Sequence, residues 1–302
     1  MRQISRRAFL KTASASAAGM AIWSGAPHLH PWGLPIALQL YSVRDLLPKD
    51  YEGTLRQLAA LGYREVEAAG FFGHSASEVK EAMRRAGLQS VSAHYPLKDL
   101  LPKVDEVIQF GKDLGGLKYI VCSSPWLKDP SRVKDPGSRA ARDAMTLDDW
   151  RWNAEQFNRI GERVNTAGIG FAYHNHTAEF RAEKDVVFYD ELLRLTDPAK
   201  VTFELDCGWT VVGGKNPVDY LTRYPTRFSM LHVKEFNLRG WAAGSEPPPS
   251  TEMDRGTIDY HPIFEAAKKC HLAHAFVEQE EFDMPPMEAL KIDADYMRAV
   301  TW

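Results

Sequence analysis

The chain has 302 residues, of which 44% are hydrophobic and 25% are charged, and its formal net charge is −3 at pH 7. This is the composition of an ordinary globular protein, and no basic run lies beyond the N-terminus, which argues against a nucleic-acid partner. Cys122, Cys207 and Cys270 lack the spacing of a zinc finger, so these cysteines are predicted to be small buried hydrophobes.

The N-terminus is predicted to be a twin-arginine export signal. Arg6 and Arg7 lie in the motif S-R-R-A-F-L-K, and a weakly apolar stretch rich in Ala and Ser follows, with a cleavage site after Ala26. This stretch is too short and too weakly apolar to span a bilayer well, so we expect no stable membrane anchor. The sequence therefore predicts that residues 1–26 are a signal peptide and that the protein is periplasmic.

Strand and helix patterns alternate along the rest of the chain. Short apolar runs predict strands at 35–41, 63–68, 88–94, 118–122, 170–174, 201–205, 228–232 and 274–278. Helical periodicity predicts helices at 51–61, 78–85 (capped by Ser77), 100–114, 147–166, 187–195, 217–223, 261–269 and 286–300. The polar segments 123–146 and 237–260 are predicted to be long loops. Eight β/α units predict a single-domain (β/α)8 TIM barrel in the α/β class, over residues 35–302.

Several of the predicted strands end in side chains that can bind a metal or transfer a proton. In V-T-F-E-L-D, Glu204 and Asp206 point to the same face because side chains alternate along a strand. His174, His232 and Glu278 mark the ends of three other strands. Such residues recur about once per β/α unit of roughly 31 residues, so they are expected to gather at the C-terminal end of the barrel.

Carboxylates and imidazoles without thiolates suit an exchangeable divalent ion: Mn, Mg, Co, Fe or Zn. Each residue taken alone has an ordinary structural alternative, because a strand histidine is commonly a satisfied core residue and a strand aspartate commonly caps the next helix. The repetition at successive strand ends favours a metal site.

The chain resembles the sugar phosphate isomerase/epimerase superfamily, the xylose isomerase-like TIM barrels, over residues 35–302. The markers are L-Q-L-Y-S-V-R-D (38–45), Y-H-N-H-x-x-E-F (173–180), E-L-D-C-G-W (204–209), H-V-K-E (232–235) and V-E-Q-E (277–280). The resemblance implies a divalent metal held by Glu179, Asp206, His232 and Glu278. Glu179 follows the fifth strand instead of lying on it, so His176 is the alternative ligand.

The resemblance also implies that the ion stabilises an enediolate while a base removes the proton next to a carbonyl. His174 or His176 is the expected base, with Glu280 a further candidate. Lys234 either contacts the developing oxyanion or forms a structural ion pair. Glu204 is expected to orient a metal ligand. The expected substrate contacts are Gln39, His94, Trp209 and Glu280, each of which has packing as an alternative role.

The expected activity is that of a metal-dependent isomerase or epimerase acting on an unphosphorylated sugar, cyclitol or keto-sugar, because phosphorylated sugars are largely intracellular. A lyase or dehydratase acting on a keto-sugar or keto-cyclitol is the alternative enzyme. A periplasmic sugar-binding barrel without turnover is the alternative from another class. The expected partner is a small-molecule sugar, and a homo-oligomer is compatible with the sequence.

Overall fold

The computed structural model describes residues 33–300, so the predicted signal peptide, 1–26, lies outside the described residues. Eight parallel strands form a closed barrel in the order β1-β12-β9-β8-β5-β4-β3-β2. The barrel strands are β1 (Ala37–Gln39), β2 (Glu65–Ala68), β3 (Gln89–Pro96), β4 (Tyr119–Ser124), β5 (Gly170–His174), β8 (Thr202–Asp206), β9 (Phe228–Val233) and β12 (His274–Val277). The predicted TIM barrel is confirmed.

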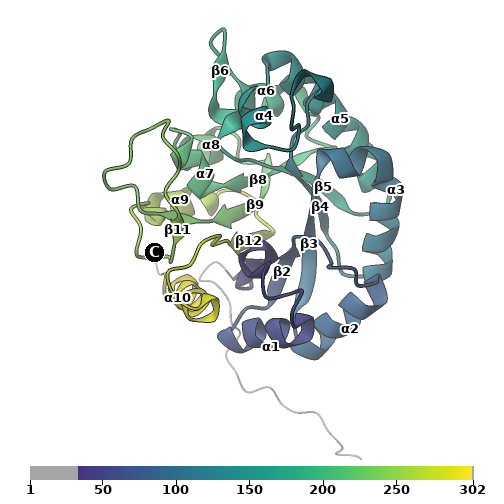
Figure 1. Cartoon of the computed structure of the whole chain (residues 1–302), viewed down its shortest axis with the longest axis vertical. Coiled ribbons are helices and arrows are strands. Elements are labelled where there is room, and N and C mark those ends of the chain that lie inside the picture. The colour runs from purple at the N-terminus through teal and green to yellow at the C-terminus, as the bar shows by residue number, and fades with distance from the viewer. Residues whose placement is uncertain (1–32, 301–302) are drawn as a thin grey trace, which may run out of the picture.

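Helices surround the strands (Figure 1). The longer ones are α1 (Tyr51–Leu61), α2 (Ala76–Ala86), α3 (Leu97–Leu114), α5 (Leu147–Thr166), α6 (Phe188–Leu195), α8 (Pro217–Arg223), α9 (Tyr260–Ala267) and α10 (Pro286–Ala299). Their ends follow capping chemistry: Thr146 and Asp149 form a capping box at the start of α5, and Gly62 ends α1 with φ of 106°. None of the described helices is long and apolar enough to cross a membrane.

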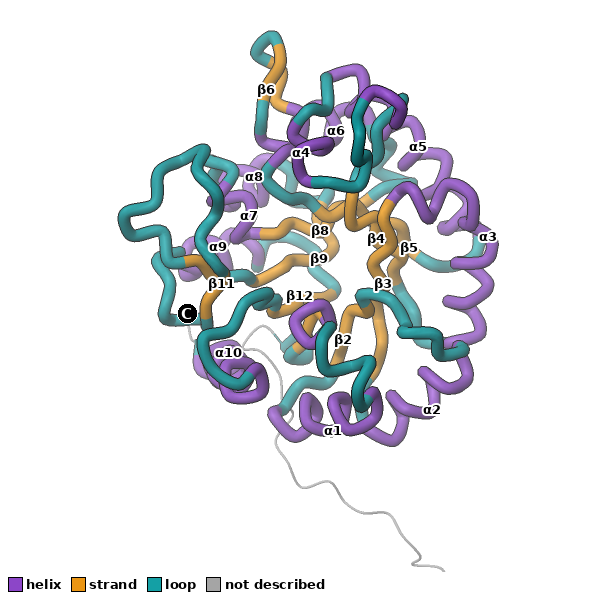
Figure 2. Tube along the Cα trace, in the orientation of Figure 1, coloured by secondary structure: helices purple, strands orange, loops and turns teal. Residues whose placement is uncertain are grey.

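The predicted loops contain short elements. Residues 123–146 include a 3-10 turn, η2 (Pro130–Arg132), and α4 (Arg139–Asp143). Residues 237–260 include β11 (Ser250–Thr251), which pairs antiparallel with β10 (Glu235–Phe236). Besides β10, the elements absent from the sequence prediction include η1 (Leu40–Val43), η3 (Ala178–Phe180), the two strands of the β6–β7 hairpin (Ala182–Glu183 and Val186–Val187) and α7 (Cys207–Val212). Figure 2 shows the loops that join the central strands to the outer helices.

Two apolar layers hold the barrel together. The outer layer lies between strands and helices and includes large aromatic side chains such as Trp150, Phe157 and Tyr173. A small inner cluster fills part of the barrel interior; it consists of Ala37, Val91, Val121, Ala172, Met230 and Phe276. The polar interior residues described below lie one or two strand positions further toward the C-terminal strand ends, where active sites of this architecture occur.

Strand register places the predicted site residues side by side. On β8, Phe203 and Leu205 pack in the outer layer, so Glu204 and Asp206 point into the barrel. In the parallel pairing, Asp206 lies opposite His232 on β9, and Glu204 lies opposite His174 on β5. The barrel geometry therefore brings together residues that are far apart in sequence.

Candidate metal centre and cavity

Four buried side chains converge at the C-terminal end of the barrel. His174, Asp206, His232 and Glu278 each offer one ligand atom, and these atoms lie within 4.8 Å of one another. His232 Nδ1 lies 3.0 Å from Glu278 Oε2 and 3.8 Å from Asp206 Oδ2. We call this set the metal quartet. Its two imidazoles and two carboxylates are ligand types that coordinate divalent Mn, Fe, Co and Zn.

Asp206 shows most directly that a cation fits the quartet. Its Oδ1 accepts the backbone N–H of Trp209 at 2.7 Å and so caps α7. Its Oδ2 is buried and has no hydrogen-bond partner. A buried carboxylate oxygen without a partner is costly, and a metal ion would satisfy it. Burial raises the pKa of Asp206 to about 7, although Lys234 and His232 lower it.

Glu179 does not lie with the quartet, in contrast to the expectation from the sequence. It follows β5 in η3, and its Oε1 accepts the hydroxyl of Tyr173 at 2.6 Å. The Tyr173 ring packs on Phe157 and Phe203 in the outer layer, so the Glu179 carboxylate lies on the helix side of β5. The chain turns after the strand end, and alternation no longer sets the direction of the side chain. His174 takes the position at the strand end.

His176, the alternative ligand, lies beside the quartet and not in it. Its ring centroid is 4.9 Å from that of His174 and 6.2 Å from that of Trp209. Its Nδ1 is buried without a hydrogen-bond partner. Burial, together with the nearby His174 and Arg142, holds the pKa of His176 well below its ordinary value.

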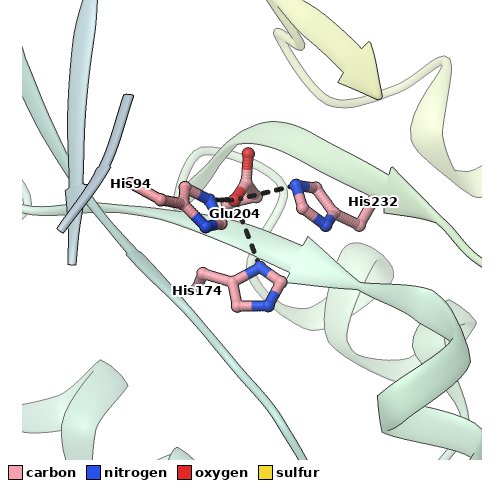
Figure 3. Close-up of side chains that lie close together, drawn as sticks. All are labelled: His94, His174, Glu204 and His232. Carbon is pink, nitrogen blue, oxygen red and sulfur yellow. Dashed lines mark hydrogen bonds and ion pairs between the residues drawn. The ribbon is translucent and has the colours of Figure 1, made fainter. Parts of the chain in front are cut away.

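Glu204 connects three histidines below the quartet (Figure 3). Its Oε2 lies 2.8 Å from His94 Nε2, 3.2 Å from His174 Nδ1 and 3.2 Å from His232 Nε2. His94, His174, Glu204 and His232 form a second set of side chains that could hold a metal ion, and with the ion in the quartet the Glu204 carboxylate would instead orient the rings of His174 and His232.

Glu67, at the inner face of β2, is a site residue that the sequence analysis missed. Its Oε1 lies 2.7 Å from His94 Nε2, 2.8 Å from His232 Nε2 and 2.7 Å from Gln39 Nε2. The sequence signal for Glu67 was the alternation of glutamate with an apolar residue in the strand E-V-E-A, which places Glu65 and Glu67 on the same face. Gln39, expected to contact substrate, is fully buried, donates to Glu67 and accepts from the N–H of Tyr41. It supports Glu67 and is not among the residues that line the cavity.

The two inner carboxylates set the charge of the neighbouring imidazoles. Burial would lower the pKa of His94, but Glu67 and Glu204 outweigh it and raise the pKa to about 9. His174 behaves in the opposite way, because burial and the adjacent His232 lower its pKa to about 4 despite the contact with Glu204.

Lys234 is fully buried and paired with carboxylates on strand ends. Its Nζ lies 2.8 Å from Glu278 Oε2, is hydrogen-bonded to Glu280, and lies 4.7 Å from the centre of the Trp209 ring. These carboxylates hold the pKa of Lys234 above its ordinary value in spite of burial. Gly208 packs on the same segment, where a Cβ would come within 2.5 Å of the Lys234 carbonyl oxygen, so the close approach requires glycine.

A cavity of about 500 Å³ opens beside the quartet. Among its lining residues are His94, His174, His176, Trp209, Glu278 and Glu280. Three of the four predicted substrate contacts thus face the cavity: His94, Trp209 and Glu280. The volume is that of a pocket for a small molecule such as a monosaccharide.

Curated relatives of this chain include inosose dehydratases. The sequence is 28% identical to that of Lacticaseibacillus casei over 135 residues, 41% of this chain and 45% of that enzyme. It is 23% identical to that of Clostridium beijerinckii over 71% of this chain and 76% of that enzyme. The chain thus aligns with less than half the length of the first relative and about three quarters of the second.

The chain is also similar to a solved structure with a different description. The crystal structure of a sugar phosphate isomerase/epimerase from Parabacteroides distasonis has a TM-score of 0.70 and 26% sequence identity, and the match covers 94% of this chain and 99% of that one. A family model described as the xylose isomerase-like TIM barrel matches residues 55–300. With this match and the closed eight-stranded barrel, the chain belongs to the xylose isomerase-like TIM barrel family.

Proposed function

We propose that this protein is a metal-dependent enzyme that acts on a keto-sugar or keto-cyclitol and removes the proton next to the carbonyl. The observation that carries the proposal is the metal quartet, in which Asp206 Oδ2 is buried without a hydrogen-bond partner beside a sugar-sized cavity. A binding barrel without turnover needs no such arrangement of two imidazoles and two carboxylates.

His174, Asp206, His232 and Glu278 would hold the ion. When bound there, a divalent cation supplies positive charge that stabilises negative charge developing on substrate oxygens. Glu204 and Glu67 keep the histidine rings in position from below. Two side chains that line the cavity thus remain for proton transfer, His176 and Glu280, and Lys234 is buried behind Glu280.

His176 is the proposed base. It lines the cavity, and burial holds its pKa well below the ordinary value, so the imidazole is neutral and one of its ring nitrogens can accept a proton. Glu280 is the proposed group that returns the proton, and buried Lys234 positions its carboxylate through a hydrogen bond. His94 and Trp209 complete the wall against which a sugar ring would pack.

The step after proton removal decides the reaction class. Return of the proton to the same carbon or its neighbour gives an epimer or isomer, whereas departure of a neighbouring hydroxyl gives a dehydrated product. Similarity to inosose dehydratases supports the second outcome, and similarity to the Parabacteroides structure supports the first. We also propose a periplasmic location and an unphosphorylated substrate, on the basis of the Arg6–Arg7 motif.

The test is incubation of the metal-loaded protein in deuterated water with 3-keto-glucosides and inososes, followed by NMR and mass spectrometry. Deuterium in recovered substrate or in an isomer of equal mass identifies isomerase or epimerase chemistry. A product lighter by one water identifies dehydratase chemistry. Absence of exchange and of product with every keto-sugar and keto-cyclitol would contradict the proposal.

A further inference from the structure

The main cavity has a small annex on the side of α4. This side pocket has a volume of about 60 Å³ and is lined by Arg139, Arg142, Asp143, His176, Thr177, Ala178 and Trp209. Three of these residues, Arg142, His176 and Trp209, also line the main cavity, so the two spaces adjoin. The side pocket has roughly the liquid volume of two water molecules, which suits a carboxylate and is too small for a sugar ring.

Arg142 brings to this pocket a cation that has no ion-pair partner in the described part of the chain, although its charge also acts on the nearby buried Glu179. Its guanidinium makes one long hydrogen bond, 3.4 Å from Nη1 to Ser124 Oγ, and it forms no ion pair with a carboxylate in the described residues 33–300. Lys234 differs, because its ammonium is paired with Glu278 and Glu280. The guanidinium therefore retains N–H groups for a ligand.

The indole of Trp209 lines the same pocket and holds a second donor, Nε1, which is buried without a hydrogen-bond partner among the described residues. A ligand reaches this nitrogen only if the ring turns, because the nitrogen has almost no accessible surface. Indole and guanidinium N–H groups can donate hydrogen bonds but cannot accept them. A group that satisfies both must be rich in acceptors, and a sugar hydroxyl, which is donor and acceptor at once, matches such a wall less well than an anion does.

The distribution of charge favours an anion with a single negative charge. Asp143 and Arg139, which also line the side pocket, lie 3.8 Å apart as an ion pair, and Arg139 is additionally bonded to Glu246. Among the residues that line the side pocket, Arg139 and Asp143 offset each other and Arg142 is left as the excess charge, while Glu246 lies outside the lining. The main cavity carries the carboxylates of Asp99, Glu278 and Glu280, which disfavour a dianionic phosphate. A planar carboxylate fits one guanidinium through two parallel hydrogen bonds.

We propose that the side pocket binds a carboxylate through Arg142 and Trp209, and that the substrates are therefore acidic sugars of the uronic-acid type. This inference rests on the proposed function for its premise that the cavity holds a sugar. A carboxylate in the side pocket would leave the remainder of the sugar in the main cavity beside the metal quartet.

Isothermal titration calorimetry with D-glucuronate, D-glucose and D-glucose 6-phosphate tests this proposal without turnover. Glucuronate should bind the metal-loaded protein about 10- to 100-fold more tightly than glucose, the range expected for a charge-assisted hydrogen bond. In Arg142→Met the preference should disappear, and Arg142→Lys should keep part of it. Arg159→Met is the matched control, because Arg159 is exposed on α5 and pairs with Glu155.

The competing explanation for a preference for glucuronate is a direct bond between the sugar carboxylate and the metal. Titration of the protein after removal of the metal with a chelator distinguishes this bond from binding by Arg142. A preference that persists in Arg142→Met but vanishes on chelation would overturn the proposal. So would tighter binding of glucose 6-phosphate than of glucuronate, or equal or unmeasurable binding of glucuronate and glucose. A preference that depends on Arg142 in a protein without proton exchange would retain this inference and overturn the proposed function.

Discussion

The identity of the ligand on β5 gives the sharpest prediction, because sequence similarity and geometry favour different residues. We expect His174→Ala to lose metal and Glu179→Gln to keep it. His174 is one of four ligand atoms within 4.8 Å of one another, whereas Glu179 accepts the Tyr173 hydroxyl at 2.6 Å on the helix side of the strand.

The magnitudes follow from these contacts. Outer-shell residues typically contribute about 10- to 100-fold to metal affinity, so loss of a direct ligand in His174→Ala should exceed about 100-fold. Glu179→Gln keeps an acceptor for Tyr173 and loses the charge on it. We expect a stability loss of about 1 kcal/mol and a metal affinity within about twofold of the wild type.

Competition with a chromophoric zinc chelator measures the affinities, and urea unfolding measures the stabilities. His176→Ala is the control on the same segment and should retain metal, because His176 lies outside the quartet. Weak metal binding by Glu179→Gln together with wild-type affinity in His174→Ala would refute the assignment.

Three further predictions concern a buried ion pair, the pH dependence of stability and export. Lys234→Met should destabilise the metal-free protein by about 3–5 kcal/mol in urea unfolding, because it leaves Glu278 and Glu280 without their buried cation. Adding Glu280→Gln to Lys234→Met should restore part of the lost stability. An unchanged unfolding midpoint in Lys234→Met would contradict this prediction. Burial raises the pKa of Asp293 to about 8 and that of Glu235 to about 7, so these two groups bind more protons in the folded state, and the stability that they contribute should fall as pH rises from about 4 to about 8. Asp293→Asn should flatten that slope in thermal unfolding, and a slope as steep as the wild type would argue against the assignment to Asp293. Changing Arg6 and Arg7 together to Lys should leave the protein in the cytoplasm on cell fractionation, and unchanged periplasmic recovery would exclude a twin-arginine signal.

The regular part of the fold could be predicted from the sequence because local signals were strong. Helix α5 and strand β5 were predicted with their observed bounds, since apolar periodicity and end signals agree there. Ser77 was the wrong cap for α2: Ser75 forms a capping box with Glu78, and the S-x-x-E spacing was present in the sequence. Helix α7 was missed because C-G-W-T-V-V has the β-branched and aromatic composition of a strand.

Site residues were predictable where strand alternation fixes the direction of a side chain. Asp206, His232 and Glu278 come from strand ends and meet as the sequence analysis expected. Glu179 follows the strand, and its direction depends on η3 and on the hydroxyl of Tyr173, neither of which the sequence pattern encodes. Glu67 lies on a strand far from the four late ones that the spacing argument covered, and only barrel closure brings it to His232.

Deuterium incorporation from solvent into a keto-sugar or keto-cyclitol tests the central claim most directly. The metal-loaded protein should exchange the proton next to the carbonyl, and both chelation and Asp206→Ala, which removes the buried oxygen that lacks a hydrogen bond, should abolish exchange. Exchange that continues at the wild-type rate in chelated protein and in Asp206→Ala would contradict the account.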